Sequence, residues 1–204
     1  MAAGFTLVEL MVVVVIIAIV TGVVITSQGA FNQTLVLTNT AYDIALTLRS
    51  AETFGLSTRA AGAAVNAGYG LHFQAGSSGS FTLFADTFPA PSCATPNCNS
   101  GDHVYTSGSD TFVQTYELGN HITIADFCAL VNNNWTCAGN GGLTSLDITF
   151  ERPNPNAFMS ENGAYSASSP VTLSCITLTS PQGGSRFLTV GVSGQIIANA
   201  LSCP

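Results

Sequence analysis

An almost uninterrupted apolar stretch near the start of the chain limits its possible folds more than any other feature. From Phe5 to Ile25 the sequence holds one charged side chain, Glu9. At about 1.5 Å of rise per residue, a helix of about 21 residues reaches about 30 Å, the thickness of the hydrocarbon core of a bilayer. The sequence therefore predicts a membrane-spanning helix at residues 5–25.

The lone acid Glu9 calls for a compensating positive charge. On the insertion scale, a carboxylate at the centre of a bilayer costs at least about 2.5 kcal/mol. A cut between Gly4 and Phe5 would create an α-amino group at Phe5. Residues four apart share one face of a helix, so this amine can meet Glu9 of a neighbouring molecule when two such helices stack with an axial offset. Repeated stacking of this kind builds a filament.

The segment Gly4-Phe5-Thr6-Leu7-Val8-Glu9 resembles the cleavage and methylation motif of type IV prepilins and type II secretion pseudopilins. In that family a prepilin peptidase cuts after the Gly and methylates the new amino-terminal Phe, and a Glu at the fifth position of the mature chain serves assembly. Gly4, Phe5 and Glu9 match these positions one by one. The resemblance implies that residues 1–4 are a cleaved leader, although such leaders usually carry Lys or Arg and Met1 to Ala3 do not.

Two other interpretations of the apolar stretch are a Sec signal peptide and a plain membrane anchor. A Sec signal peptide needs a basic region before its apolar core, which this sequence lacks. A plain anchor has no need for Glu9. The prepilin-like interpretation accounts for Glu9.

Charge and polarity narrow the possible partners. The formal net charge is −7, and the basic residues are four scattered arginines with no lysine. Because nucleic-acid binding depends on clustered Lys and Arg, nucleic acid is not an expected partner. The segment after the helix is rich in Ser, Thr, Asn and Gly, a composition that suits an exported domain.

Six cysteines, an even number in an exported domain, predict a disulfide framework. Proximity in the sequence favours the pairs Cys93–Cys98, Cys128–Cys137 and Cys175–Cys203, with other pairings left open. A zinc site is the alternative, but the cysteine spacings fit it poorly. Asp102 and Asp110 are a weak candidate pair for calcium, without a calcium-loop pattern. We therefore expect no metal site and no cofactor.

Residues 26–58 continue the helix with an amphipathic pattern. Two sets of residues recur three or four positions apart, and either can supply the stripe that packs on the soluble domain. We expect the helix to end between Gly55 and Gly62. The two sets are Phe31, Leu35, Thr38, Tyr42, Ala45 and Leu48, and Leu37, Ala41, Ile44, Leu48 and Ala51.

Residues 59–204 change to a period of two and predict a β-rich globular domain. Strands are expected near 69–73, 81–85, 112–118, 122–127, 146–150, 171–178, 186–190 and 195–198, and the first two should form a hairpin. Residues 89–110 should be an exposed loop, and 152–156 should leave the sheet because of their two prolines. The expected fold class is α+β and pilin-like, with a long amino-terminal helix and a mainly antiparallel β domain.

The carboxyl-terminal half resembles the GspH/FimT type of minor pilins and pseudopilins. The similarity lies in Leu146–Phe150, Val171–Leu178 and Arg186–Val190, with Gly194 in the closing hairpin. Leu48 to Ala51, where the helix approaches its end, is similar as well. The six cysteines and the long loops depart from a compact pseudopilin domain.

No catalytic residues and no enzymatic activity are expected, because the sequence contains no P-loop, G-x-S-x-G elbow, complete dinucleotide fingerprint or HExxH motif. Trp135, in the short Cys128–Cys137 loop, either anchors a partner or covers the sheet edge.

The resemblance implies a pilus-like filament subunit, either a major or a minor pilin, in a homo- or hetero-oligomeric filament. The implied partners are other pilins, the prepilin peptidase and an inner-membrane assembly platform. The chain would lie in the inner membrane and then in a periplasmic or extracellular filament. The alternatives are a secretion pseudopilin and an adhesive or DNA-uptake tip subunit.

Overall fold

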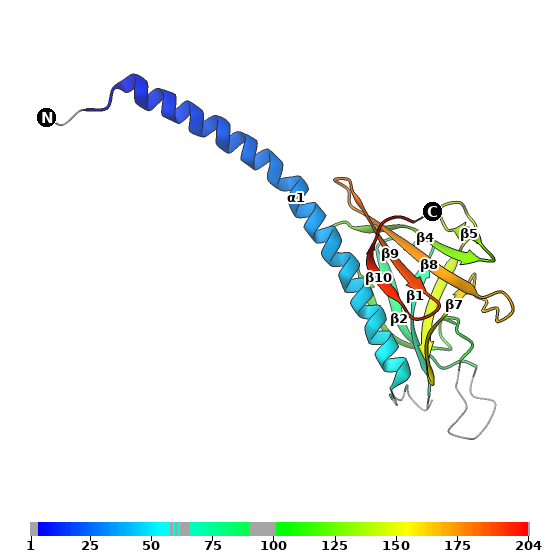
Figure 1. Cartoon of the computed structure of the whole chain (residues 1–204). Coiled ribbons are helices and arrows are strands. Elements are labelled where there is room, and N and C mark those ends of the chain that lie inside the picture. The colour runs from blue at the N-terminus through cyan, green and yellow to red at the C-terminus, as the bar shows by residue number, and fades with distance from the viewer. Residues whose placement is uncertain (1–3, 58, 60, 62–65, 90–100, 204) are drawn as a thin grey trace. The chain divides into compact units, whose positions relative to one another are not determined.

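A computed structural model describes residues 4–57, 59, 61, 66–89 and 101–203 of the chain. These residues form one α-helix, α1 (Leu7–Leu56), and ten β-strands (Figure 1). The strands pair only antiparallel, so the expected α+β fold class is confirmed. The chain divides into two compact units, Met1–Val36 and Leu37–Pro204, and α1 contributes to both.

The first sheet contains five strands in the order β3-β2-β1-β6-β7. The predicted hairpin is present as β1 and β2, with Leu71 opposite Leu83. β1 also pairs with β6, which places Leu71 opposite Ile148. These three side chains are almost fully buried. The strand bounds are β1 (Gly68–Gln74), β2 (Ser80–Asp86), β3 (Thr111–Glu117), β6 (Ser145–Glu151) and β7 (Asn154–Glu161).

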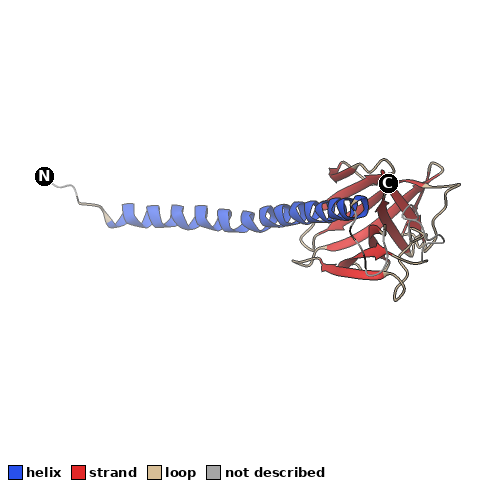
Figure 2. Ribbon diagram, turned by 90° about the horizontal axis from the view of Figure 1, so that it is seen from below, coloured by secondary structure: helices blue, strands red, loops and turns tan. Residues whose placement is uncertain are grey.

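The second sheet contains the other five strands in the order β10-β9-β8-β4-β5. The strands of the β domain lie beside the carboxyl-terminal part of α1 (Figures 1 and 2). The bounds are β4 (Thr123–Val131), β5 (Asn134–Cys137), β8 (Val171–Thr179), β9 (Ser185–Gly191) and β10 (Ile196–Ala200).

One apolar stripe attaches α1 to the β domain. Of the two predicted stripes, the one that begins at Leu37 is the buried one, while Leu35 and Tyr42 of the other are 47% and 55% exposed. The helix comes so close to β6 that a Cβ on Gly55 would lie 2.0 Å from the carbonyl oxygen of Phe150. A side chain cannot fit there, which explains the glycine. The buried stripe is Leu37, Ala41, Ile44, Leu48 and Ala51, each at most 1% exposed.

Two features of the strand pattern differ from the sequence-based expectation. Residues 154–156 do not leave the sheet, because β7 begins at Asn154 and includes Pro155. β7 is the outermost strand of its sheet, where a residue without an N–H group is tolerated. β3 and β4 follow each other in the sequence but belong to different sheets, so Gly119 and Asn120 connect the two sheets.

Candidate functional site

Thr6 caps the amino-terminal end of α1. Its Oγ1 accepts a hydrogen bond from the backbone N–H of Glu9 at 3.3 Å, and its carbonyl oxygen accepts one from Leu10 N–H at 3.2 Å. The Thr6-x-x-Glu9 spacing is that of a capping box. The helix therefore begins at Leu7, and Phe5, which we expected inside the helix, lies just before it.

The peptide bond between Gly4 and Phe5 lies in this segment ahead of the helix. Phe5 is 78% exposed, and among the described residues no atom beyond the chain neighbours lies within 4 Å of the position that a Cβ on Gly4 would occupy. A bond outside regular structure and without covering side chains is accessible to a peptidase. Nothing in the fold requires a glycine at residue 4, so the reason for this glycine lies outside the fold.

Glu9 presents an exposed carboxylate in the first turn of α1. Within the described residues, this carboxylate has no hydrogen-bond or ion-pair partner, since the contact with Thr6 uses the backbone of Glu9. A carboxylate in an apolar segment is costly unless it is paired. A charged Glu9 in this segment would therefore need a partner from outside the described residues.

The helix surface that follows Glu9 is apolar on all sides. Leu7–Ile25 has a mean hydropathy of 3.0 and no buried residue, and by length and composition it can cross a membrane. Ile16, for example, is 54% exposed. Signal sequences pass the same test, but the core helix of a soluble protein would be mostly buried. This surface needs lipid or other helices to cover it.

A comparison with family models identifies this amino-terminal site. The model described as the prokaryotic N-terminal methylation motif matches residues 1–25. The chain carries this methylation motif. The match includes Gly4, Phe5 and Glu9 and confirms the resemblance to type IV prepilins and pseudopilins. No curated protein and no solved structure matched the chain.

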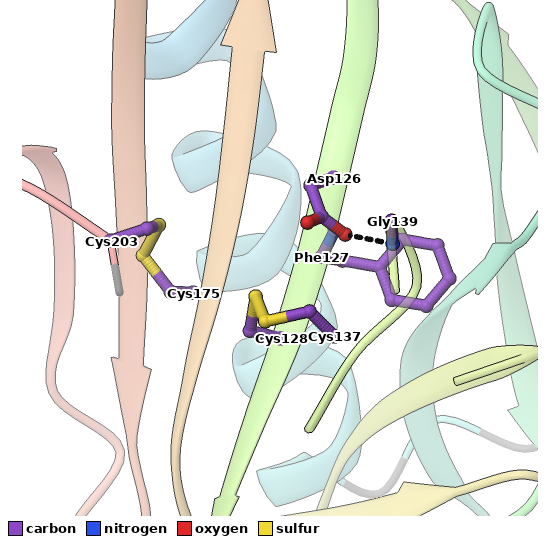
Figure 3. Close-up of a disulfide and its surroundings, with 7 residues drawn as sticks. All are labelled: Asp126, Phe127, Cys128, Cys137, Gly139, Cys175 and Cys203. Carbon is purple, nitrogen blue, oxygen red and sulfur yellow. Dashed lines mark hydrogen bonds between the residues drawn. A yellow bond between two sulfur atoms is a disulfide. The ribbon is translucent and has the colours of Figure 1, made fainter. Parts of the chain in front are cut away.

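Two disulfides lie close together in the second sheet, away from the methylation motif in the sequence (Figure 3). Cys128–Cys137 joins residues that face each other on β4 and β5, and Cys175–Cys203 ties the carboxyl terminus to β8. Cys128 also lies opposite Cys175, so proximity within the sheet alone would allow a different pairing. The expected pair Cys93–Cys98 lies outside the described residues.

Trp135 lies on the short strand β5 and is 36% exposed. Its register partner is Leu130 on β4, and a tight turn at Asn132 and Asn133, both with positive φ, joins the two strands. This position is compatible with both sequence-based interpretations, a cover for the sheet edge and a partner contact.

The carboxylate of Asp126 lies close to one of these disulfides. One ligand atom each of Asp126, Cys128 and Cys137 lies within 4.8 Å of the others. The two sulfurs are bonded to each other, so neither is a thiolate that can bind a metal. Instead Asp126 accepts a hydrogen bond from Gly139 N–H at 2.8 Å, which fixes the turn after β5.

The segment 101–110 is less exposed than the loop that we expected at 89–110, because Val104 and Asp110 are buried and Tyr105 packs on rings of the first sheet. Residues 90–100 of that predicted loop lie outside the described residues. Asp86, at the end of β2, accepts hydrogen bonds from the backbone N–H groups of Asp102 and His103 at 3.3 and 2.7 Å. Burial raises the pKa of Asp86 to about 8, and the negative charges of Asp110 and Asp102 add to this effect, while the hydrogen bond from His103 opposes it. A carboxyl group thus fastens the loop to the sheet.

Asp110 fastens the other end of this loop. Its carboxylate accepts hydrogen bonds from the backbone N–H groups of Thr87, Phe88 and Thr106 at 2.8, 2.9 and 2.6 Å. Asp102 and Asp110, the pair that we considered for calcium, therefore both accept backbone hydrogen bonds, since Asp102 accepts one from Val104 N–H at 3.1 Å. The two residues have structural roles in this loop.

Two histidines, His72 and His103, form a buried polar cluster with Asp86 and Asp147. The ring of His103 stacks on Phe158 with centroids 4.3 Å apart, and burial lowers the pKa of His103 to about 4, partly opposed by Asp102. His72 on β1 lies 2.6 Å from Asp147 on β6, measured between Nδ1 and Oδ1. Burial raises the pKa of Asp147, and His72 opposes this shift. The sequence did not reveal this cluster, since its members lie on separate strands.

Proposed function

We propose that this chain is the precursor of a structural subunit of a type IV pilus-like filament. The observation that carries the proposal is the methylation motif, which combines an accessible Gly4–Phe5 bond with an exposed apolar helix that holds one unpartnered carboxylate. A plain membrane anchor needs neither the cleavage site nor the acid.

In the proposed mechanism, the prepilin peptidase cleaves after Gly4 and methylates the new amino group of Phe5. The amine of one subunit then pairs with Glu9 of its neighbour, while the surfaces of Leu7–Ile25 pack together. Buried ion pairs contribute little net stability after desolvation, so we assign the register of the helices to this pair and the strength of the polymer to apolar packing.

This mechanism implies an order in which the chain occupies its locations and meets its partners. The precursor lies in the inner membrane through residues 5–25, with residues 26–58 and the domain at 59–204 outside the bilayer. An inner-membrane assembly platform then moves subunits into a periplasmic or extracellular filament. The helix length and composition support the first of these steps.

Among the described residues, Thr149, His103 and Glu151 line up as in a catalytic series, but their geometry agrees with a structural role. His103 Nδ1 lies 3.4 Å from Thr149 Oγ1, and His103 Nε2 lies 3.8 Å from Glu151 Oε1. Thr149 is fully buried, so a substrate cannot reach its hydroxyl group, and 3.8 Å is too long for a hydrogen bond. We therefore assign no enzymatic activity to this series.

We keep the GspH/FimT type as the finer assignment. The three segments that carry this resemblance form the strands β6, β8 and β9. A type II secretion pseudopilin would use the same motif, and a tip subunit would add a ligand on an exposed element such as β5. Recovery of the chain with an outer-membrane secretin and without a surface filament would favour the pseudopilin.

Mass spectrometry of sheared filaments tests the proposal. The chain is expected to begin at N-methylated Phe5, and a Gly4→Ala variant should keep residues 1–4 and stay in the membrane fraction. Gly22→Ala is the matched control, because neither glycine has an atom within 4 Å of its Cβ position. Filaments that contain the chain with its residues 1–4 attached would contradict the proposal.

A further inference from the structure

An open groove of about 400 Å³ lies between α1 and the end of β3. Its apolar lining includes Ile44 and the rings of Phe81 and Tyr116, which stack with centroids 5.2 Å apart and planes 7° apart. Leu46, 66% exposed, lines the helix side of the groove. Ile44 and Phe81 are themselves buried, so the apolar surface that the groove leaves open is formed by Leu46 and the half-buried ring of Tyr116.

The groove also carries two carboxylates. Asp43 lines it from α1 and Glu117 from the end of β3, and both residues are exposed. Within the residues that the structure describes, neither carboxylate has an ion-pair or hydrogen-bond partner. An apolar lining with two acids fits a side chain that has an apolar stem and a positive charge at its tip.

A lysine is such a side chain, but this chain contains no lysine. Its arginines are already engaged within the chain. Arg49 pairs with Glu52 at 2.6 Å, the guanidinium of Arg59 lies 4.0 Å from the ring centroid of Phe54, and Arg186 donates a hydrogen bond to Thr38 at 3.1 Å. The fourth arginine, Arg152, also has an interaction partner.

We propose that this groove binds a lysine side chain of a different filament subunit. The lysine stem lies along Leu46 and Tyr116, and its ammonium group pairs with Asp43 and Glu117. A lysine ammonium is strongly hydrated, which suits carboxylates that remain open to water, whereas arginine is favoured at buried, planar contacts. This inference rests on the proposed function, since it names a neighbour in the filament.

A second copy of this chain is a poor occupant of the groove. Each copy has a net charge of −7 and no lysine, so a copy placed here would bring mainly like charge toward Asp43 and Glu117. Like charges at a contact select against the wrong partner. The charge distribution therefore favours a hetero-oligomeric filament at this contact.

Carbodiimide crosslinking tests the inference in cells that assemble the full chain. The reagent joins a carboxylate to a nearby amine, and no lysine of this chain can react because none exists. We expect mass spectrometry to find Asp43 or Glu117 joined to a lysine of another protein that carries an N-terminal methylation motif. A link to Phe5 of a second copy, a link to a protein without the motif, or no link would each overturn the inference.

Substitution of the two acids provides a second readout. The double variant Asp43→Asn with Glu117→Gln should reduce the amount of chain in the filament fraction about tenfold, from the loss of two partly exposed ion pairs. Asp102→Asn removes one charge outside the groove and keeps an oxygen for Val104 N–H, so it should have no effect. An unchanged amount of the double variant would overturn the inference.

Processing of Phe5 separates the two hypotheses in the same samples. The double variant should still begin at methylated Phe5, because the groove is distant in sequence from the methylation motif. Methylated Phe5 in filaments without a lysine crosslink would overturn the inference and leave the proposed function standing. Unprocessed wild-type chain would overturn both.

Discussion

The two parts of α1 differ in what covers their apolar side chains. Ile16 and Ile44 are the same residue type on one helix, but Ile16 is 54% exposed and Ile44 is fully buried. The β domain of the same chain covers Ile44, whereas none of Leu7–Ile25 is buried within the described residues. The carboxyl-terminal part of the helix is therefore a component of the domain, and the amino-terminal part is a surface for lipid or for other subunits.

The substitutions Ile44→Ala and Ile16→Ala should show the largest contrast between the two parts. Ile44→Ala leaves a cavity between the helix and the sheets and should lower the free energy of unfolding by about 2–5 kcal/mol. Ile16→Ala removes no contact within the chain and should change it by less than about 0.5 kcal/mol. Chemical denaturation of the full chain in detergent measures both values, and equal effects would contradict the comparison.

Removal of the Cys175–Cys203 disulfide should have the next largest effect on the domain. The bond closes a loop with a sequence separation of 28, and loss of such a crosslink costs about 3–4 kcal/mol on the chain-entropy model. Denaturation of Cys203→Ser should show this loss, while cleavage and methylation at Phe5 should continue. A defect in processing as large as that in stability would show that the two parts are not independent.

The buried cluster predicts that the stability of the β domain depends on pH. The raised pKa of Asp86, about 8, means that the folded state holds a proton that the unfolded state has lost, so stability from this group falls as the pH rises toward 8. The lowered pKa of His103, about 4, has the opposite effect and makes stability rise with pH. This rise is confined to pH values below the ordinary histidine pKa of 6.5. The net fall should therefore lie between about pH 6.5 and 8.

Asp86→Asn should flatten this fall, by about 2 kcal/mol over that range. Denaturation curves at pH 6.5 and 8.5 measure the difference, with the exposed acid of Asp43→Asn as the control. An Asp86→Asn variant that loses stability between these pH values as steeply as the wild type would refute the assignment to Asp86.

Loss of a single hydrogen bond should give the smallest difference in unfolding free energy between the two parts of α1. Arg186 on β9 donates a hydrogen bond to the Thr38 hydroxyl group at 3.1 Å, and Thr38→Val should cost about 0.5–1.5 kcal/mol. Thr21→Val, in the exposed part of the helix, should leave the unfolding free energy unchanged. A destabilised Thr21→Val variant would indicate contacts that the fold does not contain.

Local patterns were sufficient to predict the helix, most of the strands and the methylation motif. Period and length identified α1, and alternation identified the hairpin of β1 and β2. The sequence could not predict which of the two apolar stripes on α1 is buried, because both have helical spacing. The packing of the sheets against the helix decides it. Leu37 and Ala41 face those sheets, whereas Leu35 and Tyr42 do not.

Long-range pairing explains what the sequence did not predict. Pro155 indicated a break, but an edge strand tolerates it, and edge position depends on the order of strands in the sheet. The cluster of Asp86, His103 and Asp147 combines β2, β6 and the segment between β2 and β3. Single residues in separate strands carry no local pattern, so their meeting follows only from the three-dimensional register.

The central claim is that Glu9 acts between molecules and not within its own domain. The most direct test compares Glu9→Gln with the wild type for the amount of chain in sheared filaments, together with processing at Phe5 and the free energy of unfolding. We predict normal cleavage and methylation, an unchanged free energy of unfolding, and at least about tenfold less chain in filaments, from the loss of an ion pair that leaves the partner amine unpaired. Wild-type amounts of Glu9→Gln in filaments would contradict the claim.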